Sequence, residues 1–481
     1  MKACCLFLAA IAAHSQPVLT VVAENAITQP ARHGAGKLIR PLVLYISDWS
    51  TDAPKAKAYT YTGTVAVEIA RAKTPAGRWD AAVRYVVNEE PGAALLHGEL
   101  AFHLTARGMS FVGNYDGTFN GIPAKGTAEA GLTWHYTDDN VRRGMLLWLP
   151  DPARPVQALL LWGNGPGLSA KHVALREDLQ AFGAANNVAV IGMDGYSIFM
   201  AQSEGRSIHD GLNSLAALSR HPELATAPIL FSGHSMGGQI AYEYNAWNPG
   251  RVIAFTVSKG GIYLTWEASQ RARANPAVLV AGETDTAGRI ASIHRLFDLN
   301  RPHGALWSVE VEEGVSHDFG RSLPLFLLHF QHALDGRPLD AGRAWLADNS
   351  TWRDGIARIF PAAGFKGDVT KMSWLLDEDV AYIYRGIATY GNPLKLALAA
   401  DHSIQYFADE PVLLDCTDFG PGEWKSVALY DRASRVAEVA RERPRVTLKS
   451  ERAGAHAGVL IGERPDGSLR TSLPVAWVVR P

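Results

Sequence analysis

Residues 227–247 read APILFSGHSMGGQIAYEYNAW, and this stretch decides the architecture at the centre of the chain. The segment 227–232 is an apolar run, which is typical of a strand that is buried on both faces. The segment 237–247 has the length and composition of an amphipathic helix, and Pro249 stops it. We therefore expect a strand and a helix joined by a very short turn.

The turn itself is Gly233-His234-Ser235-Met236-Gly237, a G-x-S-x-G pattern. In a sharp strand-to-helix turn, side chains two positions before and after the central residue would collide, which explains glycine at 233 and 237. The central serine lies at the positive end of the helix, where developing negative charge is favoured. The pattern predicts Ser235 as a nucleophile. The alternative is a glycine-rich turn that carries a solvated serine.

A serine hydroxyl needs a base to become a nucleophile, and His317 is the best candidate. It lies in a glycine-containing loop, 313–319, directly after a strand that we expect over 307–311. The other late histidines lie on helix-like stretches or in a Pro-Gly loop, where surface or core roles are expected: His294, His303, His329 and His332.

The histidine in turn needs a carboxylate that orients it and stabilises its charged form. The strand expected over 277–281 is followed by Gly282-Glu283-Thr284-Asp285. We predict Asp285 for this role and keep Glu283 as the alternative. The chain order Ser235, Asp285, His317 is the order found in α/β-hydrolases.

The fourth part of such a site is a pair of N–H groups that hold an oxyanion. One donor is expected to be the backbone N–H of Met236, directly after the nucleophile. The other is expected from Trp162-Gly163-Asn164-Gly165-Pro166-Gly167, with the Asn164 N–H as the best candidate. The glycines there let the backbone approach a substrate oxygen closely.

The middle of the chain, 142–345, alternates apolar runs with helix-length segments, which predicts a mostly parallel sheet. Residues from about 156 to 335 resemble the α/β-hydrolase superfamily in its esterase/lipase branch, through the three motifs around Asn164, Ser235 and Asp285 and through Gly314-Val315-Ser316-His317. Trp162 departs from the histidine that is common in that family. The resemblance implies an α/β-hydrolase fold and hydrolysis of carboxylic esters with no cofactor and no metal.

Two β-rich domains are expected to flank this region, over 16–141 and 346–481. Short alternating runs broken by Gly, Pro and Asn predict a sandwich or a barrel in the first. The stretch 113–121 is expected to form turns, because it is rich in Gly and Asn. In the second domain, strands are expected over 380–387, 426–430 and 474–479.

Residues 1–15 have a basic start, a short apolar run and small residues, which predicts a signal peptide and a secreted or periplasmic protein. The alternative is a buried N-terminal helix or strand. Cys4 and Cys5 would leave with the signal peptide, so that Cys416 alone remains. The formal net charge of -2 gives no electrostatic reason to expect nucleic acid as a partner, and no later run predicts stable membrane insertion.

The prediction for function is therefore an exported serine hydrolase acting on small-molecule or polymer-borne esters, such as acylated polysaccharides or aryl and alkyl esters. Only 261–276 separates two of the expected strands, which leaves no room for a large cap over the site. Two alternatives stay open. One is a peptidase, thioesterase or acyltransferase on the same residues, and the other is a non-catalytic carbohydrate- or surface-binding protein.

Overall fold

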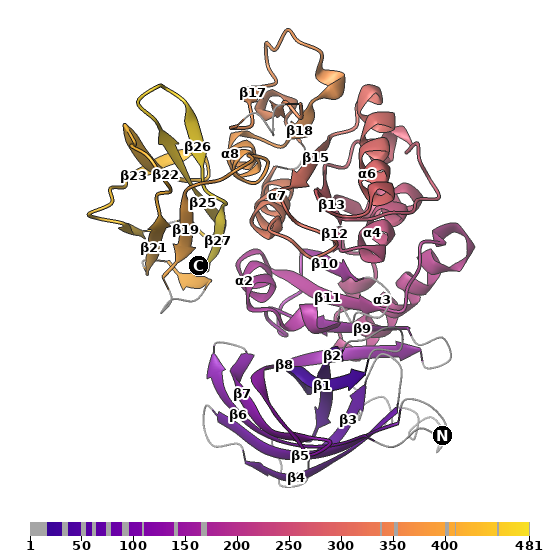
Figure 1. Ribbon diagram of the computed structural model, residues 1–481. Coiled ribbons are helices and arrows are strands. Elements are labelled where there is room, and N and C mark those ends of the chain that lie inside the picture. Colours follow the sequence, from indigo (N-terminus) through magenta and orange to yellow (C-terminus); the bar gives the residue numbers. More distant parts are fainter. Residues whose placement is uncertain are drawn as a thin grey trace.

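The computed structural model describes residues 17–30, 37–49, 54–59, 64–73, 78–88, 96–107, 110–138, 143–164, 171–336, 339–350, 355–399, 404–408, 410–449 and 452–480. Figure 1 shows a β-barrel at the bottom, a sheet covered by helices in the middle, and further β-sheets on the left. The expected signal peptide, 1–15, lies outside the described residues, as do Cys4 and Cys5. None of the described helices is long and apolar enough to cross a membrane.

The N-terminal part is a closed up-and-down barrel. Each strand pairs antiparallel with the next one along the chain, and the first strand pairs back onto the eighth, from Val18↔Thr133 to Ala23↔Ala128. Its strands are β1 Val18–Pro30, β2 Lys37–Ser47, β3 Lys55–Tyr59, β4 Thr64–Lys73, β5 Arg78–Asn88, β6 Leu96–Arg107, β7 Ser110–Phe119 and β8 Ile122–Asp138. Closure leaves no free strand edge, so of the two predicted architectures the structure has the barrel.

The inside of the barrel is apolar, because alternate residues of each strand point inward. On β5, for example, Trp79, Val83 and Tyr85 are buried, whereas Arg78 and Arg84 are exposed. The expectation of turns over 113–121 was wrong for most of that stretch, since β7 runs as far as Phe119. Pairing with two neighbouring strands overrides the weak β-propensity of its Gly and Asn residues.

Strand β8 belongs to both the barrel and the central sheet. Its last residues, Trp134 to Asp138, pair antiparallel with β9 Arg143–Trp148, and β9 is the edge strand of the central sheet. The hydrogen bonds therefore continue from the barrel into the sheet that carries the site, and the two parts cannot be displaced far without breaking this ladder.

The central sheet has the strand order β9-β11-β10-β12-β13-β14-β15, and all strands except β9 are parallel. Its remaining strands are β10 Ala158–Gly163, β11 Val188–Asp194, β12 Ile229–Gly233, β13 Val252–Ser258, β14 Ala277–Gly282 and β15 Trp307–Glu312. All six coincide closely with the apolar runs in the sequence, because a sheet that is covered on both faces needs continuous apolar strands.

Helices cover both faces of this sheet (Figure 1). One face packs against α2 Glu177–Asn186 and α7 Leu323–Asp335. The other packs against α3 Gly205–Ser219, α4 Met236–Trp247 and α6 Ala287–Asn300. The shorter helices are η1 Lys171–Leu175, η2 Met200–Glu204, η3 Pro222–Ala225, η4 Pro249–Arg251, α5 Gln270–Arg273, η5 Arg301–His303, η6 Ala341–Arg343 and η7 Val369–Lys371.

In the described residues of the C-terminal part, the strands form three small sheets. A three-stranded sheet, β17-β16-β18, adjoins the central domain, and its strand β16 crosses the boundary expected at 345/346. Two further sheets, β19-β21-β24 and β20-β27-β25-β22-β23, enclose an apolar core around Leu414, Leu460 and Trp477. The strands are β16 Trp345–Ala347, β17 Ile359–Pro361, β18 Ser373–Leu375, β19 Lys395–Leu398, β20 Gln405–Phe407, β21 Pro411–Asp418, β22 Ser426–Asp431, β23 Ser434–Glu438, β24 Arg445–Lys449, β25 Gly454–Glu463, β26 Leu469–Thr471 and β27 Val475–Arg480.

The strand expected over 380–387 is a helix, α8 Glu378–Ile387, so this expectation was wrong. Its β-branched and aromatic residues favour a strand, but the Asp377 carboxylate accepts a hydrogen bond from the Val380 N–H at 3.1 Å and caps a helix there. The buried positions Val380, Ile383, Tyr384 and Ile387 recur with helical spacing.

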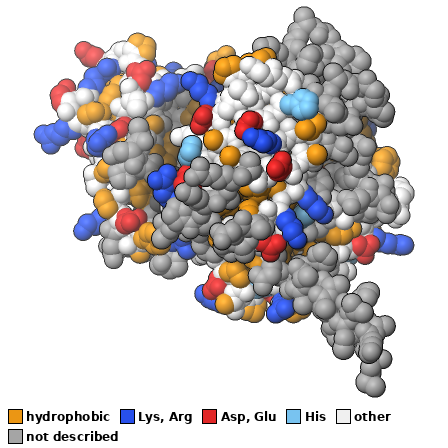
Figure 2. Space-filling model, turned by 90° about the horizontal axis from the view of Figure 1, so that it is seen from below, with side chains coloured by type: hydrophobic (Ala, Val, Ile, Leu, Met, Phe, Trp, Pro, Cys, Tyr) orange, Lys and Arg blue, Asp and Glu red, His pale blue; other side chains and the backbone are white. Residues whose placement is uncertain are grey.

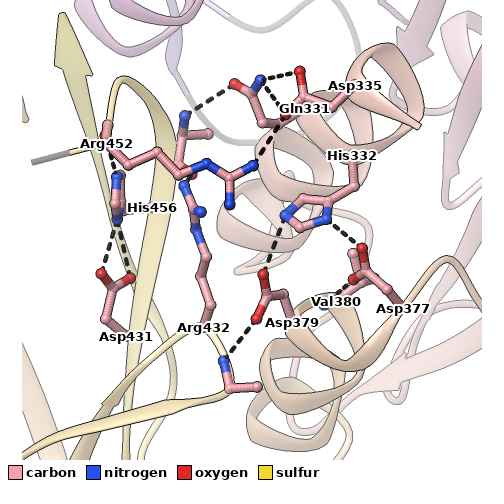
Figure 3. A network of polar contacts seen from close by, with 12 residues as sticks. Gln331, His332, Asp335, Asp377, Asp379, Val380, Asp431, Arg432, Arg452 and His456 are labelled. Carbon is pink, nitrogen blue, oxygen red and sulfur yellow. Dashed lines mark hydrogen bonds and ion pairs between the residues drawn. The ribbon is translucent and has the colours of Figure 1, made fainter. Parts of the chain in front are cut away.

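A polar network links α7, α8 and the C-terminal sheets (Figure 3). The His332 ring on α7 bonds through Nδ1 to the Asp377 carboxylate, and its Nε2 lies 3.7 Å from Asp379. The other carboxylate oxygen of Asp379 accepts from the Ala433 N–H at 3.1 Å, in the turn between β22 and β23. Buried hydrogen bonds of this kind hold the orientation of elements, because losing one partner would leave the other buried and unsatisfied.

Charges of both signs are interspersed on the face seen from below, among its described side chains (Figure 2). This distribution agrees with the nearly balanced composition of 46 Lys and Arg against 48 Asp and Glu. Cys416 is buried, and burial raises the pKa of its thiol to about 11, so this thiol is protonated and unreactive at neutral pH.

Candidate active site

The turn between β12 and α4 has the strained geometry that its sequence predicts. Ser235 adopts φ 56 and ψ -123, a conformation that residues with a side chain rarely take. The strain persists because the neighbouring strands over-determine the backbone. The Ser235 N–H donates to the Ser258 carbonyl at 2.7 Å, and the His234 N–H donates to the Gly163 carbonyl at 3.2 Å.

The glycines on either side of the turn are required for close approach. A Cβ on Gly233 would lie 2.2 Å from the Gly237 carbonyl carbon. A Cβ on Gly237 would lie 2.0 Å from the Gly163 carbonyl oxygen, at the end of β10. Both distances are far below van der Waals contact, so the turn can close only if 233 is glycine, and it can lie against β10 only if 237 is glycine.

We expect Gly237→Ala to destabilise the protein by about 1–3 kcal/mol, as overpacking of a closed core does. Gly288→Ala is the matched control, since a Cβ on Gly288 would have no neighbour within 4 Å. That change removes a glycine from the first turn of α6 and should be neutral or slightly stabilising. Urea unfolding of both variants tests this prediction. Equal unfolding midpoints would contradict the need for glycine at 237.

The structure brings Ser235, His317 and Asp285 together at the carboxyl ends of the parallel strands. The His317 Nε2 lies 2.9 Å from the Ser235 Oγ. The His317 Nδ1 lies 2.8 Å from the Asp285 Oδ2. The Asp285 side chain is 2% exposed and that of His317 is 32% exposed. A chain of hydrogen bonds therefore runs from a buried carboxylate, through an imidazole, to a hydroxyl on a strained turn.

Glu283, the alternative carboxylate, lies elsewhere in the same loop. Its Oε2 accepts a hydrogen bond from the Gly314 N–H at 2.9 Å, which stabilises the start of the loop that carries His317. The two loops are also joined through their backbones. The Glu283 N–H donates to the Glu312 carbonyl at 3.0 Å, and the Thr284 N–H donates to the Val315 carbonyl at 3.0 Å.

The two expected oxyanion donors lie beside the elbow. Met236 is the first residue of α4, where N–H groups have no partner within the helix. Asn164 is 8% exposed, and a Cβ placed on Gly237 would lie 2.6 Å from its backbone nitrogen. Both backbone nitrogens are thus close to the turn that carries Ser235. The rest of the expected oxyanion loop, 165–167, lies outside the described residues.

The sequence predicted His234 only as part of the turn, but in the structure its side chain also contacts the His317 ring. His234 is 3% exposed, and its ring contacts those of His317 and Phe319, at centroid distances of 4.9 and 4.8 Å. Burial, together with the nearby charges of His317 and Lys259, lowers the pKa of His234 from its usual 6.5 to about 3. It therefore stays neutral beside His317 and adds no competing charge.

Acid should destabilise the protein through His234 and through His329, whose pKa burial lowers to about 4. Below pH 6.5 the unfolded chain binds protons on both rings and the folded chain does not. The two neutral rings cost no stability above pH 6.5, and stability is lost as the pH falls towards 4 for His329 and towards 3 for His234. At pH 5 the expected loss is about 2 kcal/mol per histidine.

Urea unfolding at pH 7.5 and pH 5 measures this loss. His329→Phe removes one of the two groups, so its unfolding free energy should change less between the two pH values than that of the wild type. An unchanged pH dependence in His329→Phe would contradict the assignment to this ring.

Comparisons with known proteins find only solved structures of low sequence identity. No family model matches the chain, and no curated protein matches it. Among solved structures, esterase 2 of Thermogutta terrifontis is 17% identical with a TM-score of 0.29, over 42% of this chain and 89% of that one. An acetyl xylan esterase from Aspergillus awamori is 13% identical with a TM-score of 0.31, over 40% and 95%. An esterase of Pyrobaculum calidifontis is 12% identical with a TM-score of 0.29, over 39% and 76%. At these values the likenesses carry no weight for function, which has to come from the site itself.

Proposed function

We propose that this chain is a serine hydrolase with a central domain of the α/β-hydrolase type, and that it cleaves carboxylic esters. The observation that carries the proposal is the hydrogen-bonded chain from Asp285 through His317 to Ser235, with distances of 2.8 and 2.9 Å. Its members come from three separate strand ends and meet on a strained turn. A serine on the surface or a structural histidine in the core would need neither this chain of hydrogen bonds nor the strained turn.

The reaction that fits these groups is a two-step acyl transfer. His317 Nε2 takes the proton of the Ser235 hydroxyl while Oγ attacks the ester carbonyl carbon. The oxyanion is held by the amides of Met236 and Asn164. The imidazolium then gives its proton to the leaving alcohol, and the acyl group stays on Oγ. Water repeats the sequence on the acyl-enzyme, releases the acid and restores Ser235.

The short connection between β13 and β14 favours esters that are accessible from outside. The connection between β13 and β14 contains a single four-residue helix, α5 Gln270–Arg273, and no cap domain. Such a site fits an acyl group on a polysaccharide or a diffusible aryl or alkyl ester. We further propose that residues 1–15 direct the chain out of the cytoplasm, where such polymers are met.

The experiment is hydrolysis of a panel of p-nitrophenyl esters, matched amides and thioesters by the full chain. Labelling with a fluorophosphonate, located by mass spectrometry, accompanies it. We expect turnover of short-chain esters and a label on Ser235. Preference for amides or thioesters would point to a peptidase or thioesterase on the same residues. A folded protein that neither labels nor hydrolyses any member would overturn the proposal and favour a binding protein.

A further inference from the structure

A buried ion pair lies at the carboxyl ends of β13 and β15 and takes no part in the proposed chemistry. The Lys259 ammonium bonds to the Glu312 carboxylate, and their side chains are 0% and 1% exposed. Lys259 directly follows β13 and Glu312 ends β15, so the pair spans the end of β14, which lies between them. Gly282 ends β14, and a Cβ there would lie 3.1 Å from the Lys259 Cε. The Ser316 and Val315 carbonyl oxygens would be closer still, at 2.4 and 2.6 Å, so the glycine leaves room both for the loop that carries His317 and for the lysine.

The lysine end of the pair is tied to the nucleophile. Its neighbour Ser258 provides the carbonyl that accepts the Ser235 N–H at 2.7 Å. Lys259 itself adopts φ 54, a left-handed conformation, and its N–H donates to the Val280 carbonyl at 2.8 Å. A bulky residue holds this conformation only where its surroundings enforce it. The bond to Glu312 is one such constraint.

The carboxylate end of the pair is tied to the loop that carries His317. One oxygen of Glu312 accepts hydrogen bonds from the Arg321 N–H and, at 2.7 Å, from the Ser322 hydroxyl. Since Glu312 lies at the start of the loop and these donors at its end, the carboxylate closes the loop at its base. A Cβ on Gly320 would lie 1.8 Å from the other oxygen, so glycine is required there too.

A second acidic side chain lies next to the pair and shares its contact with the Ser322 hydroxyl. Glu310 is also buried, at 1% exposure, and contacts the Ser322 hydroxyl at 3.0 Å. Burial, together with the charge of Glu312, raises the pKa of Glu310 well above its usual range, which favours the neutral form of this carboxyl group. Replacing a buried ion pair by apolar residues is often neutral or stabilising. Stability alone therefore does not account for this pair.

We propose that Lys259 and Glu312 are positioning residues that hold the Ser235 turn and the His317 loop at hydrogen-bonding distance from each other. This inference rests on the proposed function for its effect on turnover, but the geometry that it explains stands without it. The pair acts through the backbone of Ser258 on one side and through the base of the histidine loop on the other, and it touches no reacting atom.

The test uses Lys259→Met, Glu312→Gln and the double variant Lys259→Met/Glu312→Leu, which leaves no charge unpaired. The ester kcat is measured per labelled site, so that misfolded protein does not count. We expect each variant, including the double one, to lose about 10²-fold in kcat with KM nearly unchanged, as misplaced catalytic groups do. Lys425→Met is the matched control, because Lys425 pairs with Glu463 on the surface of the C-terminal sheets, and it should keep wild-type kcat.

A second readout does not depend on turnover. The low-field proton resonance of the His317 Nδ1–H, assigned by its loss in His317→Ala, should shift or broaden in all three pair variants and stay in place in Lys425→Met. A double variant with wild-type kcat and an unchanged resonance would overturn the proposal. A wild type that hydrolyses no ester, but whose resonance responds to the pair, would overturn the proposed function and leave the positioning role standing.

Discussion

Ser235→Ala should abolish ester hydrolysis, with a fall in kcat on the order of 10⁶-fold, because removing the nucleophile removes the covalent step and leaves only the effects of binding and of the oxyanion donors. The change deletes one oxygen atom on a turn whose strain is set by the backbone, so folding should be preserved. KM should change little, since the hydroxyl contributes to the transition state and not to ground-state binding. Initial rates with a short p-nitrophenyl ester measure the effect.

Labelling with a fluorophosphonate gives a second, independent test of Ser235 as the nucleophile. The wild type should react with a fluorophosphonate at Ser235, and the variant should not react at all. Ser214→Ala is the matched control, since the Ser214 hydroxyl bonds only to the Asp210 carbonyl within α3 among the contacts of the described residues. It should keep full activity and full labelling. Residual turnover of more than about 1% in Ser235→Ala would show that the hydrolysis uses another nucleophile.

The centre of the fold was predictable because its signals are local. Each parallel strand is buried on both faces and therefore forms a continuous apolar run that is visible in the sequence. The turn at Ser235 was equally visible, since the short distances around Gly233 and Gly237 demand glycine at fixed spacing. Likewise His317 and Asp285 follow strand ends, and the carboxyl ends of parallel strands share one edge of a sheet.

The flanking regions were less predictable because their structure depends on distant contacts. Closure of the barrel requires β1 to pair with β8, more than one hundred residues further along the chain, and nothing in either strand alone distinguishes this from a sandwich. The helix α8 was mistaken for a strand because its residues have high β-propensity. The signal that could have revealed it was Asp377 followed by Glu378 and Asp379, a capping residue with acidic residues in the first turn.

The Lys259–Glu312 pair was invisible in the sequence for a different reason. A lysine and a glutamate more than fifty residues apart carry no sign that both are buried. Only the order of β13, β14 and β15 in the sheet, with Gly282 between them, brings the two side chains together. Features of this kind follow from the packing of several elements at once and not from the pattern of any one of them.

Asp285→Asn should lower kcat by about 10⁴-fold while leaving the protein folded. The amide favours the wrong tautomer of His317, and it removes the negative charge that stabilises the imidazolium. The Asp285 carboxylate is buried and accepts from His317 Nδ1, so an isosteric amide presents either an N–H that clashes with the ring N–H or an oxygen without charge. Rates at pH 8 should show the loss, with fluorophosphonate labelling slowed in parallel.

Glu283→Gln is the matched control, since it makes the same chemical change two residues away. The Glu283 carboxylate accepts from the Gly314 N–H at 2.9 Å, and a glutamine oxygen can accept the same hydrogen bond. Its kcat should therefore stay within about threefold of the wild type, since the hydrogen bond is kept and only the charge of its acceptor is lost. If Glu283→Gln lost 10⁴-fold and Asp285→Asn did not, the orienting carboxylate would be Glu283, and the contact between Asp285 and His317 would serve structure alone.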